Sequence, residues 1–593
     1  MYELLKRVSA FVVVLSAAAS AQTTERVSVA SGGLQGNFAS GGQSITPDGR
    51  YVAFGSRSGF VPGDTNSYWD VFVNDRQTGT TELVSATVGG EPGNDDCYVA
   101  GISADGRFVV IYSLASNIVA GDTNGFYDAF VRDRVAGTTE RVSVSSAGVE
   151  GNGPSYGCAM SSDGRYVLFQ SGASNLVVGD TNQDYDIFLR DRVAGTTTRV
   201  SLTNPGFQVN GYCLLGSMSA DARYITFSTD WQWVVSDDVD PNYDVFVRDR
   251  QAGTTEQISV PSAGGQANFD SLQSSISNDG RYVAFKSTAY NLVPGDTNNR
   301  DDIFVRDRLL QTTERVSVST SGAQGNGDCD WPVISADGRY VAFLSRSTNF
   351  VASDANGAGH DVFLRDRLMG TTELLSISSS GIQGTLYSEF SPSLSPDARW
   401  VAFTNTSPNL VPNDTNAVAD VFVRDRGAAS AFTPFCLGDG SGASCPCGNS
   451  GGPGRGCQNS ALTGGALLSA AGVASLSADT VQLTSSGELP TALSVVLQGT
   501  LAIAPVHFGD GLRCVGGPLK RLYVKAASGG TVVVPGPGDP TVSARSAQLG
   551  DPIALGSTRA IQVYYRDAQD SFCTAPLGST FNSSSGLLVA WGD

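Results

Sequence analysis

S-N-D-G-R-Y-V-A-F (residues 277–285), N-L-V-P-G-D-T-N (291–298), D-I-F-V-R-D-R (302–308) and T-T-E-R-V-S (312–317) together form one copy of a unit that decides the fold. The unit recurs, with changes, seven times between residues 23 and 426. The Asp of the D-G-R turn marks the same position in every copy. It stands at Asp48, Asp105, Asp163, Asp221, Asp279, Asp337 and Asp397. A period of 57 to 60 residues is typical of a repeat architecture.

Each copy predicts four short strands. An Asp-Gly turn, a strong hairpin signal, separates the first strand from R-Y-V-A-F. The alternation of Tyr51 and Ala53 with Val52 and Phe54 indicates that this second segment is a strand. The third strand is the D-I-F-V-R-D-R segment, and a turn that usually contains Gly leads to the fourth, T-T-E-R-V-S. In copies four and seven, Ala222 and Ala398 replace the turn Gly, so that turn either tolerates negative φ or is strained.

Seven copies of four short strands predict an all-β fold, a seven-bladed β-propeller. The chain begins with a fourth-strand sequence, T-T-E-R-V-S-V at 23–29, whereas the seventh copy stops after its third strand at Arg426. We therefore expect the N-terminal strand to complete the seventh blade. This closure would remove the open sheet edges that a linear array exposes.

The repeats resemble the TolB-like, WD-type propeller repeats of exported bacterial proteins. The resemblance rests on S-A-D-G-R-Y-V-A-F (335–343), D-V-F-V-R-D-R (420–426) and T-T-E-R-V-S (23–28), and it covers all seven blades. It implies the propeller fold. It does not imply one activity, because the family includes scaffolds, binding modules and non-catalytic domains of hydrolases.

The 593 residues are too many for one ordinary core, and we expect two domains after a targeting segment. Residues 1–21 read as a secretory signal, with Lys6 and Arg7 before an apolar segment and Ala19-Ser20-Ala21 as the cleavage site. Residues 22–429 form the predicted propeller, and 430–593 a predicted disulfide-stapled β-sandwich. A periplasmic or extracellular, monomeric protein is expected. The net charge of −19 excludes nucleic acid and anionic membrane as partners, and no further segment is long and apolar enough to span a membrane.

Export makes disulfides plausible for the ten cysteines. The last third of the chain contains six (Cys436, Cys445, Cys447, Cys457, Cys514 and Cys573), which predicts three bridges among 15 possible pairings. The other four (Cys97, Cys158, Cys213 and Cys329) lie in the repeats, either paired between blades or as buried thiols. C-P-C-G-N (445–449) and F-G-D-G-L-R-C (508–514) resemble a Cys-containing C-terminal domain of secreted planctomycete-type proteins, which implies an accessory role.

The loop between the second and third strands has the pattern Asp-x-Asn-x-x-x-Asp. Two interpretations stand: Asp and Asn close the turn by bonding their own backbone, or they supply oxygen ligands to Ca²⁺. Turn chemistry is the favoured interpretation, and Ca²⁺ is the only cofactor that the sequence suggests. The residues are Asp64, Asn66, Asp70, Asp122, Asn124, Asp128, Asp180, Asn182, Asp186, Asp238, Asp240, Asp244, Asp296, Asn298, Asp302, Asp354, Asn356, Asp361 (displaced by one position), Asp414, Asn416 and Asp420.

The segment before each first strand differs most between copies, and we expect it to share one face with the Asp/Asn loops. An acidic, aromatic rim around the channel suits a cationic peptide, a protein or a sugar, although ordinary loop variation would explain it as well. The candidate rim residues are Asp95, Asp96, Tyr98, Tyr156, Tyr212, Phe269, Asp270, Asp328, Asp330, Trp331, Tyr387 and Phe390.

Catalytic patterns are sparse. The two histidines, His360 and His507, have no metal-ligand spacing, and the G-x-S-x-G match at 448–452 lies in a Gly- and Cys-rich loop. The repeated arginines of D-G-R and R-D-R recur too regularly for a catalytic site and predict structural ion pairs. We therefore expect a binding or interaction module for an unknown protein, peptide or glycan rather than an enzyme. The alternatives are a structural envelope scaffold and a carbohydrate-active enzyme, a metal-dependent lyase or a glycoside hydrolase with Asp95 and Asp328 meeting across the channel.

Overall fold

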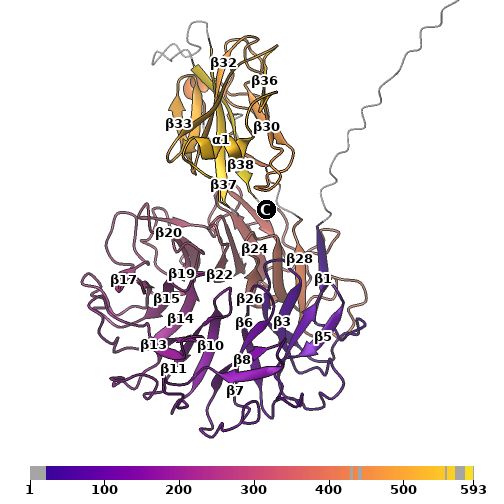
Figure 1. Cartoon of the computed structure of the whole chain (residues 1–593), viewed down its shortest axis with the longest axis vertical. Helices are drawn as coiled ribbons and strands as arrows, with labels where there is room; N and C mark the ends of the chain where they lie inside the picture. The colour runs from indigo at the N-terminus through magenta and orange to yellow at the C-terminus, as the bar shows by residue number, and fades with distance from the viewer. Residues whose placement is uncertain (1–21, 428–431, 439–443, 555–556, 568–580, 592–593) are drawn as a thin grey trace, which may run out of the picture. The chain divides into compact units, whose positions relative to one another are not determined.

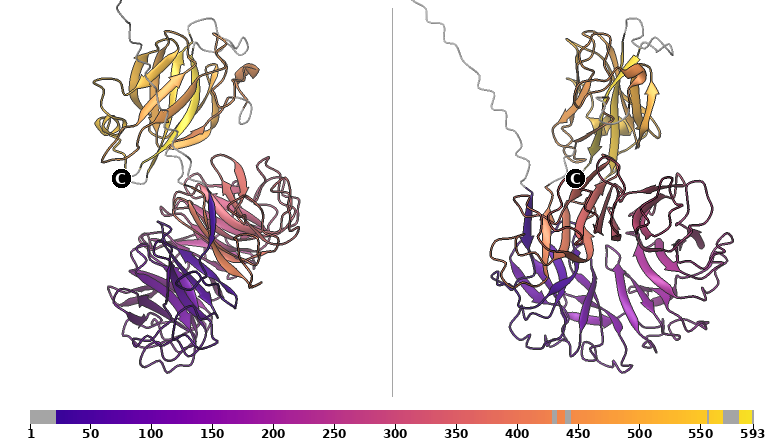
Figure 2. Two further views of the ribbon diagram at one scale, coloured as in Figure 1. Left: turned by 90° about the vertical axis from the view of Figure 1, so that its right-hand side faces the viewer. Right: turned by 180° about the vertical axis from the view of Figure 1, so that it is seen from behind.

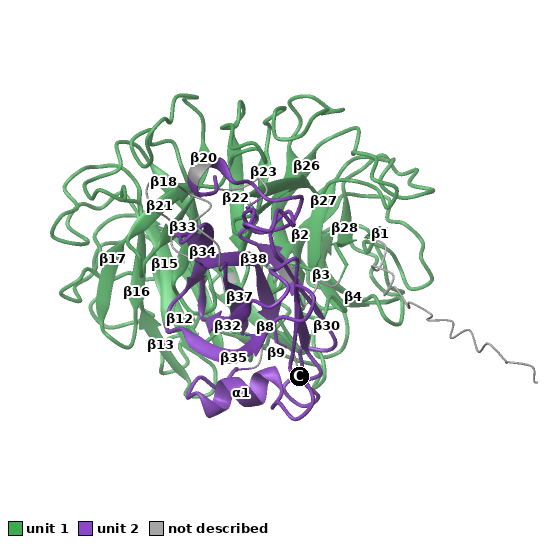
Figure 3. Cartoon of the chain, turned by 90° about the horizontal axis from the view of Figure 1, so that it is seen from above, with its two compact units in different colours: residues 1–428 green, residues 429–593 purple. Residues whose placement is uncertain are grey.

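The computed structural model describes residues 22–427, 432–438, 444–554, 557–567 and 581–591. The chain divides into two compact units, 1–428 and 429–593 (Figure 3). The predicted signal segment 1–21 lies outside the described residues.

Unit 1 contains seven four-stranded antiparallel sheets in its described residues, and these are the blades of a β-propeller. The blades are, in order, β2 (Ser40–Ile45), β3 (Tyr51–Ser56), β4 (Asp70–Asp75) and β5 (Thr80–Leu83); β6 (Cys97–Ile102), β7 (Phe108–Ser113), β8 (Asp128–Asp133) and β9 (Thr138–Arg141); β10 (Ser155–Met160), β11 (Tyr166–Ser171), β12 (Asp186–Asp191) and β13 (Thr196–Arg199); β14 (Cys213–Met218), β15 (Tyr224–Thr229), β16 (Asp244–Asp249) and β17 (Thr254–Gln257); β18 (Ser271–Ile276), β19 (Tyr282–Ser287), β20 (Asp302–Asp307) and β21 (Thr312–Arg315); β22 (Cys329–Ile334), β23 (Tyr340–Ser345), β24 (Asp361–Asp366) and β25 (Thr371–Leu374); and β26 (Ser388–Leu394), β27 (Trp400–Asn405), β28 (Asp420–Asp425) and β1 (Thr23–Arg26).

The first strand of each blade is the inner one. β6, β10, β14, β22 and β26 lie near the middle of unit 1, while β5, β13 and β17 lie at its rim (Figure 1). Each inner strand contacts the inner strand of the next blade, and β26 contacts β2, so the ring is closed. Figure 2 shows the blades fanned around this centre.

The predicted closure of the ring is confirmed. β1 pairs antiparallel with β28, from Thr23 opposite Asp425 to Arg26 opposite Phe422. The amide of Val27 then donates to the Val421 carbonyl at 2.9 Å. The N-terminal strand is therefore the outer strand of blade seven.

The third strands are buried on both faces, which the alternation seen in the sequence did not predict. All six residues of β4 are buried, as are those of β16, β20 and β28. Both faces of a blade pack against neighbouring blades, so side chains on either face are buried, the polar Asp70, Asn74 and Asp75 of β4 included. In blade one, for example, Phe54 and Phe72 stack with ring centroids 5.9 Å apart.

Ala222 and Ala398 occupy the turn in the left-handed region, at φ of 54° and 57°. Of the two possibilities that the sequence left open, strain is therefore correct at both turns, because a Cβ is disfavoured at positive φ. The equivalent Gly280 adopts φ of 73° without this cost.

The prediction that the repeated arginines are structural is confirmed. In blade five, Arg281 pairs with Asp307 at 2.7 Å within the blade. Arg308 reaches the preceding blade, where it pairs with Glu256 at 2.9 Å and lies 4.7 Å over the ring of Tyr224. Guanidinium groups thus link the turns to the strands and each blade to the next.

Unit 2 is a β-sandwich with one short helix. Its larger sheet has the order β29 (Phe432–Phe435), β38 (Phe581–Ala590), β37 (Thr558–Arg566), β32 (Leu493–Gly499) and β35 (Lys520–Ala526). The other elements are the sheet β30 (Leu467–Ala471), β31 (Gln482–Ser486) and β36 (Thr531–Val534), the hairpin β33 (Leu501–Phe508) and β34 (Gly511–Gly516), the 3₁₀ helix η1 (Pro446–Gly448) and α1 (Val542–Gln548). One core cluster joins Leu483 and Val532 of the smaller sheet to Val563 and Val589 of the larger.

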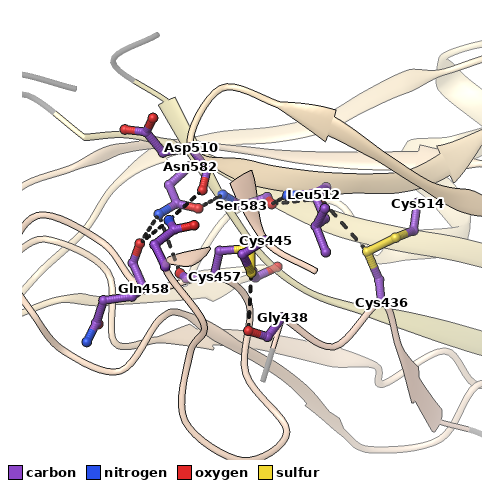
Figure 4. The surroundings of a disulfide bond; sticks show 12 residues. Cys436, Gly438, Cys445, Cys457, Gln458, Asp510, Leu512, Cys514, Asn582 and Ser583 are labelled. Carbon is purple, nitrogen blue, oxygen red and sulfur yellow. Dashed lines mark hydrogen bonds between the residues drawn. A yellow bond between two sulfur atoms is a disulfide. The ribbon is translucent and has the colours of Figure 1, made fainter. Parts of the chain in front are cut away.

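The described residues of unit 2 contain two disulfides (Figure 4): Cys436–Cys514 joins the start of the unit to β34, and Cys445–Cys457 closes a loop between β29 and β30. A third bridge was predicted in this unit. The two cysteines that remain for it are Cys447, whose side chain is outside the described residues, and Cys573, which is also outside them. In the repeats, Cys97, Cys213 and Cys329 are buried free thiols, so the alternative of pairing between blades is wrong for these three. The side chain of Cys158 is also outside the described residues. In the described part of the chain, no helix has the length and apolar character needed to cross a membrane.

Removing the closing strand should open the ring. A chain that starts at Gly32 loses the ladder with β28 together with buried Val27 and Ser28, which we expect to cost at least about 3 kcal/mol of unfolding free energy. The exposed edge of β28 should also promote association. Denaturant unfolding and size-exclusion chromatography would measure both effects, with a chain that starts at Gln22 as the control. Equal unfolding free energies for the two chains would contradict the role of β1.

Candidate functional site

The two variable loops of each blade meet on one face, as predicted. The segment before the third strand is held to the segment before the next blade's first strand by backbone and carboxylate hydrogen bonds. The amide of Trp69 donates to Asp96 Oδ1 at 2.7 Å, and the amide of Tyr243 donates to Asp270 Oδ1 at 3.0 Å. Asp328 takes the same role for the amide of Asp301 at 3.4 Å. Three of the predicted rim acids therefore fix the loops.

Seven half-buried or exposed aromatic side chains form a continuous row over blades one to four. We call this row the aromatic arc; its members are Trp69, Tyr98, Tyr112, Tyr127, Tyr156, Tyr185 and Tyr212. Neighbouring ring centroids lie between 5.0 Å (Tyr185 and Tyr212) and 6.5 Å (Tyr98 and Tyr127) apart. At these distances each ring supports the next, and the faces and hydroxyl groups that remain accessible form one extended surface.

Three members of the arc were predicted from the sequence, and four were not. Tyr98, Tyr156 and Tyr212 belonged to the predicted rim, while Trp69, Tyr112, Tyr127 and Tyr185 did not. A signal for three of the missed residues was present in the sequence. The residue before the third-strand Asp is aromatic in copies one to four and is Asp301, His360 or Ala419 in copies five to seven.

A cavity of about 470 Å³ lies at the first end of the arc. Trp69, Tyr98, Tyr112 and Phe390 contribute aromatic walls, and Arg57 contributes a charged group. Two of the aromatic walls pack directly on glycines: a Cβ at Gly41 would lie 2.5 Å from the Phe390 ring, and one at Gly55 would lie 2.0 Å from Trp69 Nε1. The guanidinium of Arg57 stands 3.7 Å from the Asp96 carboxylate.

The inner strands of blades five to seven are strained at one shared position. Gln273, Trp331 and Phe390 have φ of 51°, 55° and 60°, and Gly42 takes this conformation in blade one. Left-handed φ in a bulky residue costs free energy, and such strain gathers at binding sites. It directs two predicted rim side chains, Trp331 and Phe390, into exposed positions, at 46% and 45% of their full accessibility.

A charged cluster replaces the aromatic residues in blades five and six. Lys286 Nζ contacts Asp301 at 2.7 Å and Asp330 at 2.6 Å. Burial lowers the pKa of Lys286, but these two carboxylates more than compensate and raise it overall. His360 Nε2 accepts a hydrogen bond from Arg346 Nε at 2.9 Å, and burial lowers the pKa of the imidazole. The members of the cluster thus satisfy one another.

The remaining rim candidates lie outside the arc. Phe269 packs on Tyr290 at 5.9 Å, and Tyr387 is 46% exposed. Asp95 Oδ1 accepts from the amide of Asp96, whereas Asp328 lies 3.6 Å from Arg300. Asp95 precedes blade two and Asp328 precedes blade six, so each carboxylate has its own local partner.

The Asp/Asn loops show the predicted turn chemistry. In blade one, Asn66 Oδ1 accepts from the amide of Tyr68 at 2.8 Å, and Asn66 Nδ2 donates to Asp70 Oδ2 at 2.9 Å. The last Asp of each loop begins the third strand, is at most 1% exposed and accepts a hydrogen bond from a serine two residues beyond the fourth strand. In blade one that serine is Ser85, at 2.6 Å.

In four blades an arginine of the fourth strand lies between the two loop carboxylates. Arg315 Nη1 stands 3.1 Å from Asp296 and 3.3 Å from Asp302. Arg26, Arg141 and Arg199 do the same for the loops of blades seven, two and three. Among the described residues, no three His, Cys, Asp or Glu side chains are grouped closely enough to hold a metal ion. Calcium binding at these loops stays a prediction.

Comparison with known proteins gives no family. No protein-family model and no curated protein matches the sequence. Solved structures that resemble the chain include a putative TolB from Agrobacterium tumefaciens (18% identity, 47% of this chain and 80% of that chain, TM-score 0.30) and TolB from Acinetobacter baumannii (14%, 67% and 81%, 0.31). Another is an oligogalacturonate lyase from Vibrio parahaemolyticus (12%, 69% and 97%, 0.42). The propeller fold itself follows from the seven four-stranded sheets.

Two sets of carboxylates predict opposite effects of pH on stability. Burial raises the pKa of Asp70, Asp186 and Asp361 to about 6. Unfolding returns these groups to a pKa near 4, so the folded state holds more protons between about pH 4 and 6. This contribution therefore increases stability as the pH falls through that range.

The second set acts at lower pH. Hydrogen bonds from arginines lower the pKa of Asp133, Asp191 and Asp249 to about 2, and the stability they give is lost as the pH falls from about 4 to about 2. Together the two sets predict a maximum in melting temperature between about pH 4 and 6. Calorimetry from pH 3 to 8 would measure it, and a melting temperature that rises steadily from pH 5 to 8 would contradict the expected sign.

Proposed function

We propose that the propeller is a binding module that holds an extended, uncharged glycan chain along the aromatic arc. The observation that carries this proposal is the continuity of the arc, in which seven rings follow one another with successive centroids 5.0 to 6.3 Å apart. The C–H faces of sugar rings stack on aromatic faces, while tyrosine hydroxyl groups bond to sugar hydroxyls.

The cavity at the first end of the arc supports the same proposal. Aromatic walls with one polar end are typical of small-molecule sites, and a terminal sugar fits a cavity of about 470 Å³. Arg57 and Asp96 at this end offer a donor and an acceptor to hydroxyl groups. The net charge of −19 opposes binding of polyanionic glycans, which favours an uncharged chain.

Export is part of the proposal. We infer that residues 1–21 direct secretion, so the mature chain would meet glycans of the cell envelope or of the surroundings. The two disulfides of unit 2 support an oxidising location.

Removal of one ring from the arc should weaken glycan binding. For residues 22–593, a glycan array would identify a ligand and calorimetry would give its affinity. We expect Tyr127→Ala and Tyr185→Ala each to weaken binding about five-fold, because one aromatic stacking contact contributes about 1 kcal/mol. Tyr290→Ala is the matched control, since Tyr290 is 55% exposed but packs on Phe269 outside the arc.

Three outcomes separate the alternatives. Absence of glycan binding, or equal losses for the arc variants and the control, would refute the proposal. Melting temperatures of the variants close to that of the wild type would show that the losses are local. Cleavage of the bound glycan, measured as new reducing or unsaturated ends, would instead favour the carbohydrate-active enzyme.

A further inference from the structure

In four of the seven blades, a positively charged arginine side chain lies in the Asp/Asn loop. In blade five, Arg315 lies between Asp296 and Asp302, and three other blades repeat this arrangement. The guanidinium comes from the last residue of the fourth strand. Two carboxylates that are mostly withdrawn from water need such a partner, because burial of unpaired charge is costly.

Two blades without this arginine satisfy the third-strand carboxylate through an amide donor alone. In blade six, where the arginine position is Leu374, Gln383 Nε2 donates to Asp354 Oδ1 at 2.9 Å and to Asp361 Oδ2 at 2.8 Å. In blade one, where it is Leu83, Asn66 Nδ2 donates to Asp70 Oδ2 at 2.9 Å. Both buried third-strand carboxylates are therefore satisfied.

Blade four has neither solution. Gln257 stands at the arginine position and lies beside Asp244, but its amide donates to Gln266 Oε1 at 2.9 Å, and the side chain carries no charge. Asp240 stands where blade five has the amide donor Asn298, so the loop contains three carboxylates and no cationic side chain at the fourth-strand position. Asp238 and Asp244 are only 2% and 1% exposed.

One carboxylate oxygen of blade four, Asp244 Oδ2, lacks the positively charged partner that the equivalent oxygen has in four other blades. Asp244 Oδ1 accepts from Ser259, but Asp244 Oδ2 has no hydrogen-bond partner in the described part of the chain. In blades two, three, five and seven, the same Oδ2 atom contacts the arginine. The orphaned oxygen of blade four thus faces the position at which the other blades hold a positive charge.

We propose that blade four binds one divalent cation, of the Ca²⁺ type, through Asp238, Asp240 and Asp244. Oxygen ligands on a short loop match the preference of Ca²⁺ and its tolerance of irregular geometry. The three carboxylates are not grouped at metal-binding distances in the structure. Binding therefore requires partly exposed Asp240 to move toward the buried pair, and the ion replaces the arginine of the other blades.

The first test measures Ca²⁺ binding to residues 22–593 by calorimetry and by thermal melting in CaCl₂ or EDTA at neutral pH. We expect one site per chain and a melting temperature at least about 2 °C higher with Ca²⁺. Asp240→Asn should weaken Ca²⁺ binding at least about ten-fold, because it removes a charged ligand from a partly exposed position. Absence of binding in the wild type, or unchanged affinity of the Asp240→Asn variant, would overturn the proposal.

The second test places an arginine side chain in the proposed Ca²⁺ site. Gln257→Arg restores the arginine of the other blades, so this variant should melt at the same temperature in CaCl₂ and in EDTA. Asn298→Asp in blade five is the matched control: it creates the same three-carboxylate loop but keeps Arg315, and we expect the single Ca²⁺ site of the wild type and no second one. A full Ca²⁺ response in the Gln257→Arg variant would place the ion elsewhere and refute the blade-four site.

Discussion

A buried carboxylate at the start of every third strand is the constraint on which the propeller depends. Asp302, for example, is fully buried, and its two oxygens are satisfied by a serine, a loop asparagine and an arginine. The arginine and the serine come from the end of the fourth strand and the residues just after it, and the asparagine comes from the loop. Satisfying one carboxylate therefore fixes the loop, the outer strand and the start of the central strand together.

The same constraint explains where the blades differ. Because the carboxylate is kept, each change in a partner has to be compensated within its own blade, as Gln383 does in blade six. Blade four keeps the carboxylate and changes both partners, which leaves Asp244 Oδ2 without a donor. The blades also differ at the residue before this carboxylate. Tyr127 and Tyr185 stand there in blades two and three, whereas Asp301 and His360 stand there in blades five and six, and these side chains are only partly buried.

Much of the architecture was predictable because it repeats. The Asp-Gly turns, the alternating apolar residues and the displaced T-T-E-R-V-S at residue 23 together predicted seven blades and their closure by β1. The candidate site was predictable only in part. Tyr98 and Tyr156 stood out as variable residues, whereas Tyr112 lies within a strand whose pattern appeared purely structural, and its place in the arc depends on packing between blades.

The sequence by itself determined the repeat, the strand order and the residue types at each position, because these follow from local periodicity and turn chemistry. Only the tertiary structure decided which side chains act together. Trp69 and Tyr212 are more than 140 residues apart, and they belong to one arc because blades one to four follow one another around a closed ring. The partners of each buried carboxylate were decided in the same way, since hydrogen bonding depends on distances in space that a one-dimensional pattern does not contain.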